Sequence, residues 1–308
     1  MIKRELIESV IAGEPVTRIP CMFWQAPSMY TCPEEQAEKI AAFYERHDSD
    51  IIKINNIPPI PVSSTGRHVP DGKTDLSMGS VNHGPLHQQL QVLKSFIPMK
   101  KDSAPVLFTV LSPLSSAAAM YPHLLTDASV SPSQKEELLT DISERTCSLV
   151  RTAVEAGADG IFFITTMASY DALSPSLYRK YGFPYDIAVL SSSPGWCNIL
   201  HAEGKEIMFP LLRKYPVQFI TRNAPDSLQG LKEMAALSQK SIIGGLSLDS
   251  LSQDRRDYLE HEVYMALKET QGKRLIISPG TALPDSITQE TTTWLKHMLA
   301  EFEHKLLR

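Results

Sequence analysis

Short apolar runs alternate along this chain with longer stretches of helical periodicity. The runs are rich in β-branched and aromatic residues, and their continuous apolar character is typical of strands buried on both faces of a parallel sheet. Strands are predicted at eight such runs, over residues 19–24, 51–55, 106–111, 160–165, 198–202, 217–222, 241–246 and 274–278. Helices are predicted between or after them, over residues 34–47, 132–156, 175–190, 207–214, 227–238, 254–270 and 288–305.

This alternation predicts an α/β fold, a single (β/α)8 TIM barrel that spans residues 1–308 as one domain. An open, doubly wound sheet is the main alternative. Neither a G-x-G-x-x-G turn nor a G-x-x-x-x-G-K-[ST] loop follows any of the runs, so the sequence lacks the usual phosphate-binding signatures of open sheets. Their absence favours the barrel.

Residues 56–104 interrupt this rhythm after the second predicted strand. The segment contains IPPIPV, HVPDGK and SMGSVNHG, and it holds only one short helix candidate. Long ordered loops in compact domains usually have a function, and in a barrel this one starts at the end where ligands bind. We therefore expect a long excursion over the mouth of the barrel. A passive flap, or a contact surface of a homodimer, is the alternative.

Composition and charge restrict the classes of function. The chain has 308 residues, of which 43% are hydrophobic and 21% charged, with a formal net charge of -5 and a mean hydropathy of -0.14. This balance disfavours a nucleic-acid-binding protein, and no window approaches the roughly 18 to 20 apolar residues of a membrane span. The four cysteines form no C-x-x-C pair, and the N-terminus lacks the apolar core of a signal peptide. A cytoplasmic protein without nucleic-acid or membrane partners is expected.

Polar residues that follow the predicted strands are the candidates for chemistry, because barrel active sites lie where strands end and loops begin. The most informative pair is His201 and Glu203 in ILHAEGK, since residues two apart on a strand extend from the same face. An imidazole beside a carboxylate suits a metal ion or proton transfer, although a structural histidine beside a surface glutamate explains the same pattern. The other candidates are Asp171 and Tyr170 for catalysis, and Trp24, Gln25, Asn55, Arg222, Asp249 and Thr281 for substrate binding.

Taken in order, these segments resemble the uroporphyrinogen decarboxylase superfamily, which includes the decarboxylase and the corrinoid-dependent methyltransferases that act on a thiol such as coenzyme M. The resemblance is carried by ELIESVIAGEPVTRIPCMFW, PVLFTVLSPLSSAAAM, EAGADGIFFITTMASYDALSPSLYRKYGFPY, ILHAEGK, IIGGLSLDSL and ISPGTALPDSITQE. It covers nearly the whole chain. It implies a single (β/α)8 barrel with a deep cleft at the C-terminal ends of the strands.

The chain departs from the decarboxylase branch at the arginines that grip the substrate. That branch carries R-Q-A-G-R just after the first strand, whereas this chain reads WQAPSMY, without an arginine. A polycarboxylate would lose its bidentate anchors here. Uroporphyrinogen is therefore not the expected substrate.

The chain also departs from the methyltransferase branch, which holds zinc with an H-x-C pair at the fifth strand and a cysteine in an S-P-G-C turn at the eighth. His201 matches the histidine of that pattern, but Glu203 and Thr281 stand at the two cysteine positions. Zinc (Zn) also accepts imidazole and carboxylate ligands, so the resemblance leaves open a zinc site at His201 and Glu203. Such a site needs a further ligand, for which Asp249 or Asp171 is a candidate.

Three functions remain open on the sequence. The leading one is a methyltransferase-like enzyme in which His201 and Glu203, with or without zinc, activate a small-molecule acceptor for methyl or one-carbon transfer. No segment resembles a corrinoid-binding domain, so any corrinoid would arrive on a separate methyl-carrier protein. The second is a cofactor-independent decarboxylase or lyase, in which Asp171 or Glu203 stabilises a protonated intermediate, Tyr170 positions it and Arg222 holds a carboxylate. The third is a barrel that has lost its chemistry and serves as a binding protein.

Overall fold

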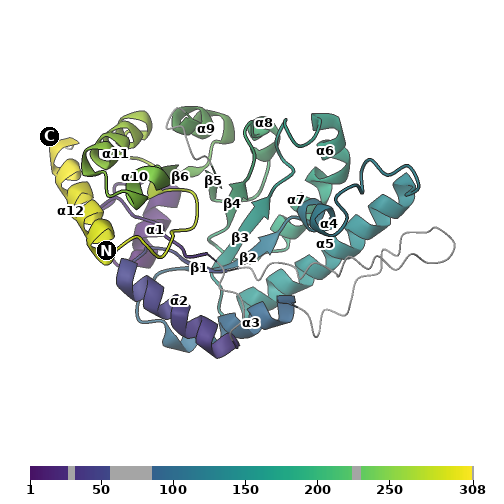
Figure 1. Ribbon diagram of the computed structural model, residues 1–308, viewed down its shortest axis with the longest axis horizontal. Coiled ribbons are helices and arrows are strands. Elements are labelled where there is room, and N and C mark those ends of the chain that lie inside the picture. Colours follow the sequence, from purple (N-terminus) through teal and green to yellow (C-terminus); the bar gives the residue numbers. More distant parts are fainter. Residues whose placement is uncertain (27–31, 56–84, 224–229, 307–308) are drawn as a thin grey trace.

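The computed structural model describes residues 1–26, 32–55, 85–223 and 230–306 of the chain. Within them the fold is α/β, with one curled parallel sheet whose strands follow one another in chain order (Figure 1). The strands are β1 (Ile52–Ile54), β2 (Val106–Leu111), β3 (Gly160–Thr165), β4 (Ile199–Ala202), β5 (Phe219–Arg222), β6 (Ser241–Gly245) and β7 (Leu275–Ser278). Seven of the eight predicted strands therefore lie within two residues of their expected bounds.

Helices surround the strands on the outside of this sheet (Figure 1). They are α1 (Lys3–Ala12), α2 (Pro33–His47), α3 (Pro85–Phe96), α4 (Pro113–Met120), α5 (Pro132–Glu155), α6 (Pro175–Tyr181), α7 (Phe183–Ser191), α8 (Phe209–Leu212), α9 (Leu231–Ser238), α10 (Leu248–Ser252), α11 (Arg256–Thr270), α12 (Gln289–Leu306) and the 3-10 turn η2 (Ile97–Met99). In the described part of the chain, no helix combines the length and the apolar character that crossing a membrane requires.

Local sequence signals explain where several helices begin and end. The Ser131 hydroxyl accepts the backbone N–H of Gln134, and proline follows at the first helical position of α5. The helix predicted over 175–190 is divided into α6 and α7 at Gly182. Pro184 lies in the first turn of α7 and has no N–H to donate to the preceding turn, so a continuous helix is interrupted there.

The segment 19–24, predicted as the first strand, forms one isolated bridge, between Cys21 and Ile277, and no strand. On the β7 side, the backbone N–H of Met22 donates to the Ile277 carbonyl at 2.9 Å, and the N–H of Ile277 donates to the Pro20 carbonyl at 2.9 Å. The segment therefore lies along β7 and pairs with it at only one residue position. The prediction of eight regular strands is corrected at this element within the described residues.

Side chains explain why this segment does not extend the ladder towards β1. The backbone N–H of Cys21 donates to the Asp50 carboxylate at 2.8 Å, and that of Phe23 donates to the Ser49 hydroxyl at 2.9 Å. These two donors are therefore not free to bond a neighbouring strand. The Asp50 N–H donates in return to the Cys21 carbonyl at 2.8 Å, so the segment bridges the two edges of the sheet. The result is a TIM-barrel-like enclosure.

Alternate strand residues face two separate apolar regions. The region enclosed by the sheet, here called the inner cluster, contains residues from the 19–24 segment, from most strands and from α1: Ile7, Val10, Met22, Trp24, Ile51, Leu107, Phe162, Cys197, Ile199, Phe219, Ile243 and Ile276. The other strand residues pack outward against the helices. The inside is thus a packed core, and a residue two positions beyond an inner-cluster member faces the same enclosed side.

The excursion predicted over residues 56–104 lies mostly outside the described residues, in 56–84. Its remaining part contains α3 and η2, and α3 packs against α2. The Gln89 side-chain amide of α3 donates to the Thr109 carbonyl of β2 at 2.7 Å. The segment from residue 85 onward is therefore a helix of an ordinary βα unit, and the expectation of a loop with one short helix is corrected there.

Candidate functional site

His201 lies on the enclosed side of the sheet, at the C-terminal end of β4. Its neighbour two positions earlier, Ile199, belongs to the inner cluster, and the histidine itself is only 5% exposed. Its Nε2 atom lies 3.8 Å from Oε1 of Glu203, which is close but beyond hydrogen-bond distance. Its buried Nδ1 atom has no hydrogen-bond partner among the described residues. The imidazole therefore has one nitrogen near a carboxylate and one available to a ligand.

Aromatic rings surround this imidazole. The His201 ring stacks on Phe162 of β3 with 5.3 Å between centroids, and it meets the edge of Trp24 at 6.3 Å. Burial, together with the charge of Lys53, lowers the pKa of His201 from 6.5 to about 3. The imidazole is therefore neutral at neutral pH, and it can donate or accept a hydrogen bond.

Lys53 of β1 is the group that sequence reasoning missed. It follows Ile51 of the inner cluster by two positions and lies in register with Leu107, another member, so its side chain faces the enclosed side. The residue is 6% exposed. Its Nζ atom lies 4.9 Å from the Phe162 ring centroid and 5.7 Å from that of Trp24. A lysine inside an otherwise apolar strand was the signal in the sequence that could have identified it.

Burial lowers the pKa of Lys53 from 10.5 to about 7, and the charge of Glu203 acts in the opposite direction. The half-buried Glu203 shows the complementary shift, since burial raises its pKa while Lys53 opposes the rise. The backbone N–H of Glu203 donates to the Thr165 carbonyl at 2.9 Å, which extends the pairing of β3 and β4 by one residue. The site therefore combines an amine, an imidazole and a carboxylate whose protonation states influence one another.

Thr221 of β5 is a second interior residue absent from the sequence-based candidates. It lies in register with His201, and its buried Oγ1 atom has no hydrogen-bond partner among the described residues. Gly280, with a φ of 68°, passes close to the end of the same strand, and a Cβ added there would lie 2.4 Å from the Arg222 carbonyl oxygen. Only glycine therefore allows this close backbone approach.

Arg222, predicted to hold a carboxylate, extends from the opposite face of β5. Its neighbour Ile220 packs in the outer apolar region, and the Arg222 guanidinium lies against Gly230 at the start of α9. Burial lowers its pKa, and Glu233 of α9 partly compensates. The structure therefore does not bring Arg222 together with His201.

Tyr170 and Asp171 lie beside the loop that follows β4. The Tyr170 side chain is 49% exposed, and its backbone N–H donates to the Glu206 carbonyl at 2.8 Å. The Asp171 carboxylate accepts the backbone N–H groups of Lys205 at 3.0 Å and Glu206 at 3.2 Å. These bonds, that of Glu206 foremost, lower the pKa of Asp171. In this structure Asp171 therefore supports the loop that carries Glu203.

The remaining candidates divide between the mouth and the surface. Asn55 accepts a hydrogen bond from Lys53 Nζ at 3.4 Å and so belongs to the interior site. Gln25 forms an isolated bridge with Leu283, and Thr281 is partly buried in the adjoining turn after β7. Asp249 lies in α10, where its carboxylate is 3.2 Å from the Arg255 guanidinium. Asp249 is thus engaged at the surface.

The described residues do not fit a catalytic zinc ion. Such sites use three protein ligands. Here His201 and Glu203 approach one another, and the described ranges contain no group of three or more His, Cys, Asp or Glu side chains that could hold a metal ion. The positive charge of Lys53 beside this pair further disfavours a divalent cation. We therefore assign the pair no metal-dependent step.

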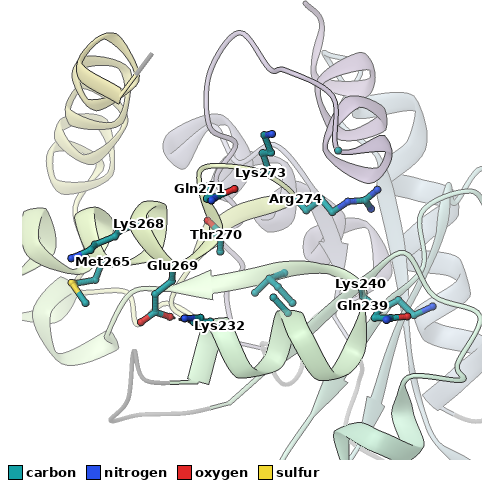
Figure 2. Close-up of a pocket in the computed structure, with 13 residues that line it drawn as sticks. Lys232, Gln239, Lys240, Met265, Lys268, Glu269, Thr270, Gln271, Lys273 and Arg274 are labelled. Atoms are coloured by element: carbon teal, nitrogen blue, oxygen red, sulfur yellow. Dashed lines mark hydrogen bonds between the residues drawn. The ribbon is translucent and has the colours of Figure 1, made fainter. Parts of the chain in front are cut away.

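A separate hollow of about 820 Å³ opens at the other end of the sheet, where β6 and β7 begin (Figure 2). Lys240 and Arg274 border it, directly before those two strands. Arg274 donates to the carbonyls of Ile11 and Ala12 and so caps the end of α1, which is a structural role. Because the strands are parallel, this hollow lies away from the C-terminal end that carries His201.

Comparison with known proteins identifies the family. The family model for uroporphyrinogen decarboxylase (URO-D) matches residues 70–302. The chain belongs to the uroporphyrinogen decarboxylase family. The resemblance inferred from the sequence motifs is thus confirmed for this URO-D family member. No curated protein sequence matches the chain.

Solved structures share the fold of this URO-D family member. A methyltransferase from Methanosarcina mazei is similar with a TM-score of 0.76 and 15% identity, over 98% of this chain and 99% of that one. A Listeria monocytogenes protein, provisionally described as a vitamin-B12-independent methionine synthase, has a TM-score of 0.59 and 11% identity, over 92% of this chain and 96% of that one. At such identities the likeness establishes the common fold.

Proposed function

We propose that this URO-D family protein is a methyltransferase-like enzyme that passes a methyl or other one-carbon group to a small acceptor at the His201–Glu203 pair. The observation that supports the proposal is the neutral, buried imidazole, whose Nε2 lies 3.8 Å from a carboxylate and whose Nδ1 has no partner among the described residues. Family membership and the fold shared with the Methanosarcina mazei methyltransferase favour this reaction class.

The proposed chemistry begins with proton transfer from the acceptor. Nδ1 of His201 accepts the proton of a thiol, hydroxyl or amine group, and the acceptor keeps the electron pair of the broken bond. Because burial and Lys53 lower the pKa of His201 to about 3, this transfer requires the carboxylate of Glu203, which lies near Nε2 and stabilises the imidazolium that forms. The deprotonated acceptor then forms a bond to the methyl carbon, and the donor leaves with the electrons of its former bond to that carbon. A separate methyl-carrier protein, corrinoid or other, supplies the donor.

The apolar surroundings assist the first step. Phe162 and Trp24 exclude water from the imidazole, so the proton stays between the acceptor, His201 and Glu203. The alternative of a decarboxylase or lyase has less support, because the guanidinium of Arg222 lies against α9. We therefore prefer methyl transfer, without a metal ion, to carbon dioxide release.

The proposal is tested by turnover with a model donor and acceptor. Methylcobalamin and 2-mercaptoethanol are incubated with the purified protein, and the methylated thiol is measured by mass spectrometry. His201→Ala should lower kcat/KM by about 10²- to 10⁴-fold, the usual contribution of a general base. Glu203→Gln should lower it less, since the imidazole remains.

A matched control is His297→Ala, because His297 is an exposed histidine on α12. This variant should retain the activity of the unmodified protein. Metal analysis of the same preparation should show no stoichiometric zinc. Absence of methylated product with the unmodified protein, or full activity of His201→Ala, would refute the proposal.

A further inference from the structure

Lys53 carries an amine into the enclosed side of the sheet without a described counter-ion. Among the described residues, no carboxylate lies within 4.0 Å of its Nζ atom, and this atom makes one hydrogen bond, to Asn55 at 3.4 Å. An ammonium group has three hydrogens to donate, so a single long bond leaves it poorly satisfied. Its other described neighbours are the faces of Trp24 and Phe162.

Two other lysines with little exposure, Lys135 and Lys3, are paired in this protein. Lys135 is 8% exposed, yet its amine donates to the carbonyls of Leu125 at 3.2 Å and Asp127 at 3.0 Å. Lys3 forms ion pairs with two aspartates. A buried charge is costly unless a partner compensates it, and exceptions of this kind gather at functional sites. The exception at Lys53 therefore leaves its amine able to bind an anionic ligand.

The position of Lys53 determines what such a ligand can reach. Its amine and the imidazole of His201 contact the same Phe162 ring, at 4.9 Å and 5.3 Å from the centroid. Both also lie beside Trp24. Lys53 and His201 therefore share two aromatic neighbours, which places the amine and the imidazole in one site.

We infer that Lys53 is the anion-binding residue of this site, and that it holds the carboxylate of a small monocarboxylate acceptor. A lysine offers a point charge and no bidentate fork, so it suits one anionic group. The nearby carboxylate of Glu203 repels a second one. The role of the bound carboxylate as part of an acceptor rests on the proposed function, whereas its binding at Lys53 does not.

Binding is measured without turnover, with sodium propionate as the anion and propionamide as its neutral counterpart, at constant ionic strength. Dissociation constants are obtained from thermal unfolding shifts and from tryptophan fluorescence, to which Trp24 contributes. The unmodified protein should bind propionate at least about tenfold more tightly than propionamide. Lys53→Met should weaken propionate binding at least about tenfold and leave propionamide binding unchanged.

Two further variants make the result specific. Lys240→Met, at the hollow of Figure 2, makes the same substitution at the opposite end of the sheet and should retain propionate binding. Lys135→Met removes an amine that already donates to two carbonyls outside this site, and it should also retain propionate binding. If circular dichroism shows that Lys53→Met does not fold, Lys53→Gln takes its place with the same expected result.

Equal propionate affinity in Lys53→Met and the unmodified protein would overturn the inference, and so would equal affinity of the unmodified protein for propionate and propionamide. Failure here is distinguishable from failure of the proposed function. Anion binding that depends on Lys53, together with an absence of methyl transfer, would refute only the proposed function. Methyl transfer that requires His201, with anion binding independent of Lys53, would refute only the inference.

Discussion

Replacing Lys53 by methionine is expected to stabilise the folded protein, although most substitutions of buried residues destabilise. Methionine keeps the apolar stem that packs against Trp24 and Phe162 and removes the charged amine between those rings. The variant therefore isolates the cost of a buried cation from the benefit of its packing.

The pKa of Lys53 gives the size and the pH range of this effect. Burial, opposed by Glu203, lowers the pKa from 10.5 to about 7 in the folded protein. Each pKa unit corresponds to about 1.4 kcal/mol, so the charge costs the folded state up to about 5 kcal/mol. Below the folded pKa the amine is charged in both states and the whole cost is present. Between the two pKa values the unfolded chain binds the additional proton, so the stability of the unmodified protein rises with pH.

The assay is urea unfolding followed by circular dichroism at two pH values. The gain from Lys53→Met should approach about 5 kcal/mol at about pH 6 and fall to about 2 kcal/mol at about pH 9. Lys135→Met is the matched control, because the amine of Lys135 donates to the carbonyls of Leu125 and Asp127. This control should lose about 1 kcal/mol at both pH values, since it removes the donor of two partly buried carbonyls.

Two outcomes would contradict this reasoning. A loss of stability in Lys53→Met at both pH values would mean that the amine makes favourable interactions in the folded protein. An equal gain at both pH values would mean that its pKa is not lowered. Either result would also remove the energetic basis for a ligand-supplied anion at Lys53.

Three further predictions concern other parts of the fold. Burial raises the pKa of the Asp186 carboxyl group to about 7, although the hydroxyls of Tyr178 and Tyr215 donate hydrogen bonds that lower it. The folded protein therefore keeps the carboxyl proton to a higher pH than the unfolded chain does. Stability should fall between about pH 4 and pH 7, and thermal melts of Asp186→Asn should show no such slope. Gly280→Ala places a Cβ 2.4 Å from the Arg222 carbonyl oxygen of β5, at a residue whose φ is 68°. Urea unfolding should show that the free energy of unfolding falls by about 1–3 kcal/mol. An unchanged unfolding midpoint would contradict this prediction. Asp171→Ala should speed hydrogen exchange at the backbone amides of Lys205 and Glu206, which donate to this carboxylate, and leave the core amides unaffected. Equal exchange rates in the variant and the unmodified protein would show that other contacts hold the loop.

Much of the architecture follows from local pattern. Continuous apolar runs predicted β2 and β3 with the bounds that the structure shows, because such runs are stable only where both faces of a strand are buried. The same alternation predicted that His201 and Glu203 extend from one face of β4, and their side chains approach to 3.8 Å. These features need only the geometry of an extended chain.

Pairing between distant segments could not be predicted in the same way. The run at 19–24 has the composition of a strand, yet Asp50 and Ser49 take two of its backbone donors. These residues are 26 to 29 positions away in the chain. A local pattern does not contain such a contact, so only the folded arrangement reveals it.

The composition of the site depends on how the sheet closes. Alternation assigns the residues of a strand to two faces, but it does not say which face is enclosed. Lys53 and Thr221 turned out to face the inside, whereas Arg222, one position beyond Thr221, packs against α9. Neighbouring residues of one strand therefore lie in different surroundings, one in the enclosed interior and the next against the outer helices. The inner and outer sides become distinct only when the sheet curls and the 19–24 segment bridges its edges.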